Sequence, residues 1–239
     1  MGKILKRFSQ LPPYPALALL CAALAACSGG GGPGQPQGLS AAAQLGQKIF
    51  SDQTLSVSGK QSCASCHVAS FAFAEDSSAG GPDRGLPVPL GGPGMDLPGF
   101  RNTPSLMYAS FIPAFYFDSD GNPNGGLFRD GRAATLEDQA VLPFVTAFEM
   151  ANADAAAVIG KLKTRPYLDE FTAIYGAEVL SDPDTALKRI GAALAAFERE
   201  NPAFHPFSSK FDAWRSSQAS LSAQELRGFA LFNNSTKGN

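Results

Sequence analysis

The 239-residue sequence is poor in the residue types that carry most metal and disulfide chemistry, with 4 cysteines, 2 histidines and a single tryptophan. So few cysteines exclude the dense disulfide framework of small secreted proteins. The charge is also sparse: setting aside Lys3, Lys6 and Arg7 leaves 16 basic against 21 acidic side chains. This acidic balance excludes a basic nucleic-acid-binding surface, so no nucleic acid is expected among the partners.

The N-terminal region has no apolar run long enough to span a bilayer, because residues 16–26 supply only 11 consecutive apolar side chains. Basic residues precede this run, so residues 1–26 are predicted to be an export signal. Leu24-Ala-Ala-Cys27 also resembles a bacterial lipobox, which predicts that Cys27 is lipidated; the alternative is a plain secretory signal cut near Ala26. The protein is expected in the periplasm. A lipid anchor alone would hold it to a bacterial membrane, the outer membrane.

The remaining chain divides by composition. Residues 27–38 are mainly Gly, Pro and Gln, and predict a flexible tether. Beyond it the apolar content, 44% for the whole chain, is that of a globular protein. Alternating strand patterns are missing, whereas capped apolar stripes predict helices beginning after Ser40, Thr135, Asp182 and Ser222. Residues 80–99 contain twelve Gly or Pro and predict a long loop. The expected fold class is therefore all-α.

The sequence Cys63-Ala-Ser-Cys66-His67 carries the clearest chemistry. A redox dithiol, half of a zinc site and covalent attachment of a c-type haem are the three interpretations. Zinc lacks further ligands, because His205 is the one remaining histidine. On a helical turn the two cysteines face one way and can form thioethers, while His67 can bind iron. The pattern therefore favours one covalently bound haem c.

An internal repeat links the two ends of the globular part. Leu39-Ser40 leads to Gly46-Gln-Lys-Ile-Phe50, and Leu221-Ser222 leads to Gly228-Phe-Ala-Leu-Phe232. Because the first copy precedes the haem motif, the second is expected to begin another haem domain whose motif lies beyond residue 239. The predicted domains are 39–210, a haem domain, and 211–239, the first helical region of a truncated second one.

Several further motifs occur in the order seen in one family: Leu45-Gly-x-x-Ile-Phe-Ser-Asp, Arg101-Asn-Thr-Pro-Ser-Leu, Phe128-Arg-Asp-Gly-Arg132, Thr135-Leu-Glu-Asp-Gln-Ala and Glu149-Met150. With the haem motif, they make residues 39–239 resemble the N-terminal part of the bacterial dihaem cytochrome c peroxidase family, which includes the MauG proteins. The resemblance implies a cytochrome c-like helical haem domain that reduces hydrogen peroxide. A second haem domain would supply the electrons.

The resemblance also implies roles for individual residues. His67 would be the proximal ligand of the haem iron. On the distal side, Gln139 would hold peroxide by hydrogen bonds and Pro143 would limit access. Glu149 would move a proton from the near to the far peroxide oxygen, so that water leaves. Asn102 matches an asparagine that helps to bind an interdomain Ca²⁺ in the family.

Arg132 has two open interpretations, a partner of a haem propionate or a solvated residue at a helix start. The sequence departs from the family at Arg129, where a tryptophan is common, and it has no histidine between residues 71 and 101 to cover the distal side. The expected partners are hydrogen peroxide and an electron-donor cytochrome or cupredoxin, with a homodimer left open. The alternative function is a periplasmic electron-transfer cytochrome without peroxidase chemistry, in which a Met or His fills the sixth iron position.

Overall fold

A computed structural model describes residues 38–78 and 86–236. The predicted export signal, lipidated Cys27 and almost all of the tether lie outside the described residues. Contacts group Leu39–Asn239 into one compact unit, which is described by itself. Within the described ranges, no helix is both long and apolar enough to cross a membrane.

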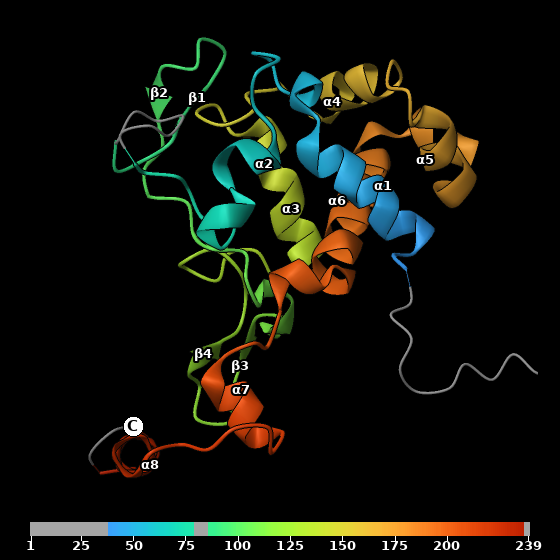
Figure 1. Cartoon of the computed structure of the whole chain (residues 1–239). Coiled ribbons are helices and arrows are strands. Elements are labelled where there is room, and N and C mark those ends of the chain that lie inside the picture. The colour runs from blue at the N-terminus through green and yellow to red at the C-terminus, as the bar shows by residue number, and fades with distance from the viewer. Residues whose placement is uncertain (1–37, 79–85, 237–239) are drawn as a thin grey trace, which may run out of the picture. The chain divides into compact units, whose positions relative to one another are not determined.

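The described unit is mainly helical (Figure 1). The α-helices are α1 (Ala41–Ser51), α2 (Cys63–Cys66), α3 (Leu136–Val145), α4 (Ala155–Leu162), α5 (Leu168–Tyr175), α6 (Pro183–Glu200), α7 (Lys210–Arg215) and α8 (Ala223–Phe232). Short 3-10 turns lie at Gln53–Leu55, Ala69–Phe71, Ala109–Phe111, Ala177–Ser181 and Pro202–Phe204. The prediction of a helical fold is confirmed.

Helix α6 is the centre of the fold, and α1 and α3 both pack across it (Figure 1). Glycine permits both close crossings. A Cβ at Gly46 of α1 would overlap the Ala193 carbonyl of α6, and a Cβ at Gly191 of α6 would overlap the Glu137 carbonyl of α3. The apolar stripe of α6 is buried between these helices, so burial of that stripe is what stabilises the arrangement.

Helix starts follow the predicted caps. The side chains of Ser40, Thr135, Asp182 and Ser222 each accept a hydrogen bond from a backbone N–H in the first turn of α1, α3, α6 and α8. Helix α3 contains Pro143 and continues two residues beyond it, to Val145. A proline lacks an N–H and crowds the preceding turn, so the helix ends soon after it.

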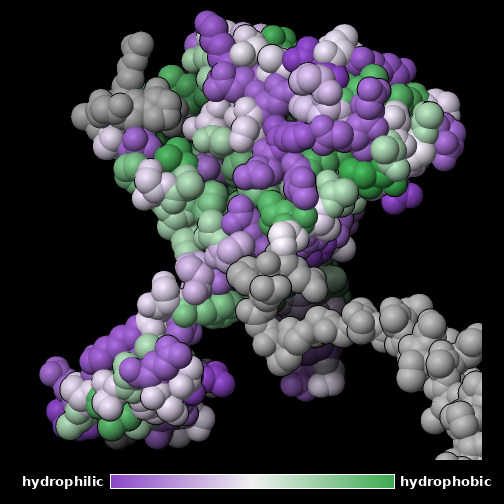
Figure 2. Space-filling view, turned by 45° about the vertical axis from the view of Figure 1, so that its right-hand side comes forward, coloured by the Kyte–Doolittle hydropathy of each residue, from purple (hydrophilic) through white to green (hydrophobic). Residues whose placement is uncertain are grey.

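The predicted loop at residues 80–99 and a later loop contain short strands that the sequence pattern did not show. Strand β1 (Leu90–Gly91) pairs antiparallel with β2 (Leu97–Pro98), and β3 (Tyr116–Phe117) pairs antiparallel with β4 (Pro123–Asn124). Two-residue strands are too short for an alternating pattern, which explains why the sequence did not predict them. On the face seen in Figure 2, polar residues are interspersed with apolar ones.

Candidate functional site

Helix α2 presents the two cysteines of the predicted haem motif. Its start is stabilised by Ser65, whose hydroxyl accepts a hydrogen bond of 2.9 Å from the Ser62 backbone N–H. Cys63 and Cys66 are partly buried, and Cys63 is a free thiol. Burial, together with the negative charge of Glu198, raises the pKa of the Cys63 thiol to about 12. The thiol is therefore protonated at neutral pH and packs as an apolar group.

His67 follows α2 directly, and its ring orientation is fixed. Its Nδ1 lies 2.8 Å from the Phe73 carbonyl oxygen. A carbonyl oxygen can only accept a hydrogen bond, so Nδ1 carries the proton and Nε2 of the neutral ring keeps its lone pair. Burial lowers the pKa of His67, against the opposing effect of the Phe73 and Pro104 carbonyls. A neutral imidazole with one nitrogen held by a backbone carbonyl is the usual state of a metal-binding histidine.

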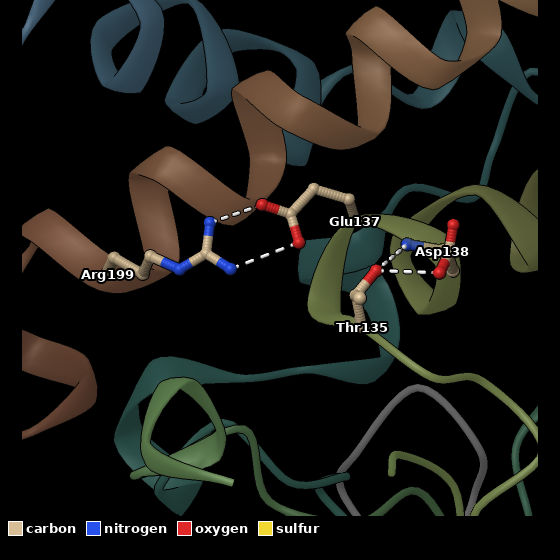
Figure 3. Close-up of polar contacts among 4 residues, drawn as sticks. All are labelled: Thr135, Glu137, Asp138 and Arg199. Atoms are coloured by element: carbon tan, nitrogen blue, oxygen red, sulfur yellow. Dashed lines mark hydrogen bonds and ion pairs between the residues drawn. The ribbon is translucent and has the colours of Figure 1, made fainter. Parts of the chain in front are cut away.

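Helix α3 carries Gln139 and Pro143 four residues apart, so the two lie on the same face, and both are partly buried. Its first turn is anchored twice (Figure 3). The Thr135 hydroxyl accepts a hydrogen bond from the Asp138 N–H, and the Glu137 carboxylate forms an ion pair with Arg199 of α6. The cap stabilises the start of α3, and the ion pair joins that turn to α6.

Glu149 lies in a turn that folds back against the end of α3. The Met150 N–H donates to the Pro143 carbonyl at 3.1 Å, and the Glu149 N–H donates to the Thr146 carbonyl at 3.0 Å. Burial raises the pKa of Glu149, while the Thr146 hydroxyl and the positive charge of Arg132 oppose the rise. A raised carboxyl pKa makes the carboxylate a stronger proton acceptor.

Arg132 and Asn102 each have a partner on the surface. Arg132 forms an ion pair of 2.8 Å with Asp130, and its guanidinium stacks 3.7 Å from the centre of the Phe128 ring. The Oδ1 of Asn102 accepts a hydrogen bond of 2.7 Å from Arg129. The described part of the chain holds no cluster of three or more His, Cys, Asp or Glu side chains suited to a metal ion.

Sequence reasoning missed two buried polar residues near α2. Glu198 is 4% exposed and Gln61 is 3% exposed, and one oxygen of each, Oε2 and Oε1, has no hydrogen-bond partner among the described residues. Burial raises the pKa of Glu198 to about 8, against the neighbouring Arg199. A signal was present for Glu198, because it follows the buried Leu194 by four residues and so shares the apolar face of α6.

A c-type haem fits these residues. The two cysteines lie one helical turn apart beside a histidine whose Nε2 is available to iron. The two buried residues with an unpartnered side-chain oxygen, Glu198 and Gln61, lie near the cysteines. Glu198 acts electrostatically on Cys63, and the Gln61 side-chain N–H donates to the Cys66 sulfur at 3.7 Å.

The sequence profile of one family, described as di-haem cytochrome c peroxidase, matches residues 40–220. This chain belongs to the di-haem cytochrome c peroxidase family. It is 39% identical over 193 residues to the methylamine utilization protein MauG of Paracoccus denitrificans, covering 80% of this chain and 49% of that protein. It is 30% identical over 196 residues to the cytochrome c551 peroxidase of Nitrosomonas europaea, covering 81% of this chain and 49% of that protein.

The structure agrees with this assignment. The diheme peroxidase BthA of Burkholderia thailandensis superposes with a TM-score of 0.70 and 37% sequence identity, covering 84% of this chain and 47% of BthA. The predicted family is thus confirmed, and membership implies a haem c cofactor. The chain spans about half the length of the curated relatives it matches.

Proposed function

We propose that this chain forms the peroxide-reducing haem domain of a di-haem peroxidase. The observation that carries the proposal is the convergence of the attachment and distal groups on one place. The Gln61 side chain, which donates to the Cys66 sulfur at 3.7 Å, and the Phe148 carbonyl, next to Glu149, both lie against Gly91. This packing supports the proposal that the haem motif and the turn after α3 border one site.

Bound to Cys63, Cys66 and His67, one haem c would supply the iron and the redox electrons for peroxide reduction. The protein's own side chains would handle the proton. Gln139 holds hydrogen peroxide by hydrogen bonds, and the adjacent ring of Pro143 limits what can enter. The Glu149 carboxylate takes the proton from the near oxygen and returns it to the far oxygen. The O–O bond then breaks with water as the leaving group.

Each peroxide requires two electrons and two further protons to give two molecules of water. The proposed electron source is a second haem domain, of which residues 211–239 form the first helical region, fed by a cytochrome or cupredoxin. In support, α8 repeats the α1 pattern, but the two glycines differ in their surroundings. A Cβ on Gly46 would overlap α6, whereas a Cβ on Gly228 meets no atom within 4 Å among the described residues. The space at Gly228 would accommodate another helix packed against α8, as α6 packs against α1 at Gly46.

Arg132 and Asn102 complete the proposed site. Arg132 acts electrostatically on Glu149, so we assign it to the haem side of the domain, as a partner for a propionate. Asn102 remains the proposed Ca²⁺ residue, and a homodimer remains a proposal too. The chain is proposed to work in the periplasm, exported by residues 1–26 and anchored to the outer membrane through lipidated Cys27.

The proposal is tested by mixing the haem-loaded full chain with hydrogen peroxide and following the Soret band by stopped flow. A vacant sixth iron position and a fast spectral change, first order in peroxide, are expected. A resting spectrum of six-coordinate low-spin haem that peroxide leaves unchanged would support the electron-transfer cytochrome instead.

A further inference from the structure

The β1–β2 hairpin packs directly on the turn that carries Glu149. The Gly92 backbone N–H donates a hydrogen bond of 2.9 Å to the carbonyl oxygen of Glu149 itself. Two residues beyond the hairpin, the ring of Phe100 lies with its centre 4.6 Å from that of the Phe148 ring. The loop after the haem motif thus contacts Phe148 and Glu149, two consecutive residues of the turn after α3.

Gly91 makes the closest approach in this contact. A Cβ at this position would overlap the Phe148 carbonyl oxygen and would lie 2.9 Å from Nε2 of Gln61. The φ of Gly91 is not in the left-handed region, so any residue could adopt its backbone conformation. The position therefore requires glycine for space alone.

The other side of the turn is held independently. Asn152 is 2% exposed, and its side-chain amide donates to the carbonyls of Leu55 and Phe144 at 2.9 and 2.8 Å. The Val57 N–H donates to the Met150 carbonyl at 2.9 Å. These bonds fix the residues after Glu149. Glu149 itself is held through its N–H by the Thr146 carbonyl and through its carbonyl by the hairpin.

We propose that the β1–β2 hairpin is a positioning element for Glu149, acting through the close approach of Gly91 and the hydrogen bond of Gly92. The inference rests on the proposed function, in which Glu149 carries the proton. A carboxylate that shuttles a proton between two oxygens must be placed within a fraction of an ångström. Because Glu149 lies beyond the end of α3, the helix alone does not supply that precision.

The experiment compares Gly91→Ala with Gly99→Ala in the haem-loaded full chain. Gly99 is the matched control, since a Cβ there would meet its nearest atoms at 3.5 Å, which is ordinary van der Waals contact. Gly91→Ala is expected to slow the reaction with hydrogen peroxide by about 10- to 100-fold, the usual cost of misplacing a catalytic group by about 1 Å. Gly99→Ala is expected to react at the wild-type rate.

Hydrogen exchange supplies a readout independent of turnover. Gly91→Ala should speed amide exchange in residues 144–152, and Gly99→Ala should not. Should Gly91→Ala fail to accumulate with haem, Phe100→Ala replaces it. Phe100 is 84% exposed, so its loss spares the fold while removing the ring contact with Phe148. A severalfold slower peroxide reaction is then expected.

A double-mutant cycle separates positioning from general damage. If Gly91 acts through Glu149, Gly91→Ala should slow the Glu149→Gln variant much less than it slows the wild type. Equal slowing in both backgrounds, or a wild-type rate for Gly91→Ala despite faster exchange, would overturn the positioning role alone. A wild-type rate for Glu149→Gln would instead overturn the proposed function, and the positioning role with it.

Discussion

Arg129 donates a hydrogen bond of 2.7 Å to Oδ1 of Asn102, which lies 27 positions earlier in the sequence. Asn102 is the residue proposed for Ca²⁺. The contact bears on that proposal, because the guanidinium occupies the oxygen that Asn102 would offer to the ion. Both are cations, so they compete for that oxygen.

Replacing Arg129 by Ala should therefore strengthen calcium binding. We expect Ca²⁺ to bind the Arg129→Ala variant about tenfold more tightly than the wild type, the worth of one hydrogen bond to a charged group. The measurement is calorimetric titration of Ca²⁺ into the chelator-treated, haem-loaded protein extended through the proposed second haem domain. Arg215→Ala, an exposed arginine on α7, is the control. Equal affinities in all three proteins would show that the Arg129 contact does not compete with calcium.

Covalent haem attachment is the second prediction. Thioether bonds survive acid-acetone extraction, so the purified chain should keep its Soret band and give a c-type pyridine haemochrome. Replacing Cys63 and Cys66 together by Ala should abolish attachment and, since bound haem stabilises only the folded state, lower the thermal midpoint sharply. Ser58→Ala, close in sequence to the motif but outside it, serves as the control. Haem that is lost from the wild type on extraction would contradict the prediction.

The third prediction concerns proton transfer at Glu149. Glu149→Gln keeps the size of the side chain and removes the carboxylate, so the peroxide reaction should slow by about two to four orders of magnitude. Gln139→Ala should cost less, because it removes a hydrogen bond and no proton transfer. Rates come from stopped-flow mixing, with haem content and helicity unchanged. Glu178→Gln, on the exposed surface, should react like wild type, and the same behaviour in Glu149→Gln would exclude the assigned role.

Membrane attachment should depend on Cys27. A single acyl chain binds membranes only reversibly, so several chains on this residue are expected. Cys27→Ser should move the protein from the membrane fraction to the soluble periplasmic fraction, measured by fractionation and immunoblotting. Cys21→Ser, inside the predicted signal, is the matched control and should remain with the membrane. Recovery of Cys27→Ser in the membrane at the wild-type level would refute the lipobox.

The fifth prediction follows from the burial of Glu198, whose pKa is raised to about 8 from an ordinary value of 4.5. Between these values the folded chain holds a proton that the unfolded chain has released. The free energy of unfolding should therefore fall as pH rises from about 5 to 8, by at most about 5 kcal/mol. Glutamine cannot ionise, so Glu198→Gln should match the wild type at pH 5 and exceed its stability at pH 8.

Denaturant unfolding of the haem-loaded chain at a series of pH values measures this difference. The control is Glu178→Gln, which removes an exposed carboxyl. Its stability curve should run parallel to that of the wild type. If Glu198→Gln also runs parallel, the Glu198 carboxyl is ionised in the folded chain and the explanation by burial fails.

The sequence alone determined the features that depend on neighbours within one or two helical turns. The caps at Ser40 and Thr135 could be read from side-chain chemistry, because each satisfies backbone N–H groups only three residues away. The Cys63-x-x-Cys-His67 spacing likewise predicts haem attachment, since one helical turn sets which side both cysteines face. The proposed distal residues come from the order of family motifs, because single Gln, Pro and Glu side chains carry no local signal.

The tertiary structure alone decided which distant segments meet. Glu149 contacts Gly92 across 57 positions, Asn102 meets Arg129 across 27, and Glu198 is buried near Cys63. None of these contacts can be predicted from the local pattern of apolar residues. Each depends on where the loops lie once α1 and α3 are packed against α6. Those crossings depend in turn on close packing at Gly46 and Gly191, which a hydrophobic pattern does not specify.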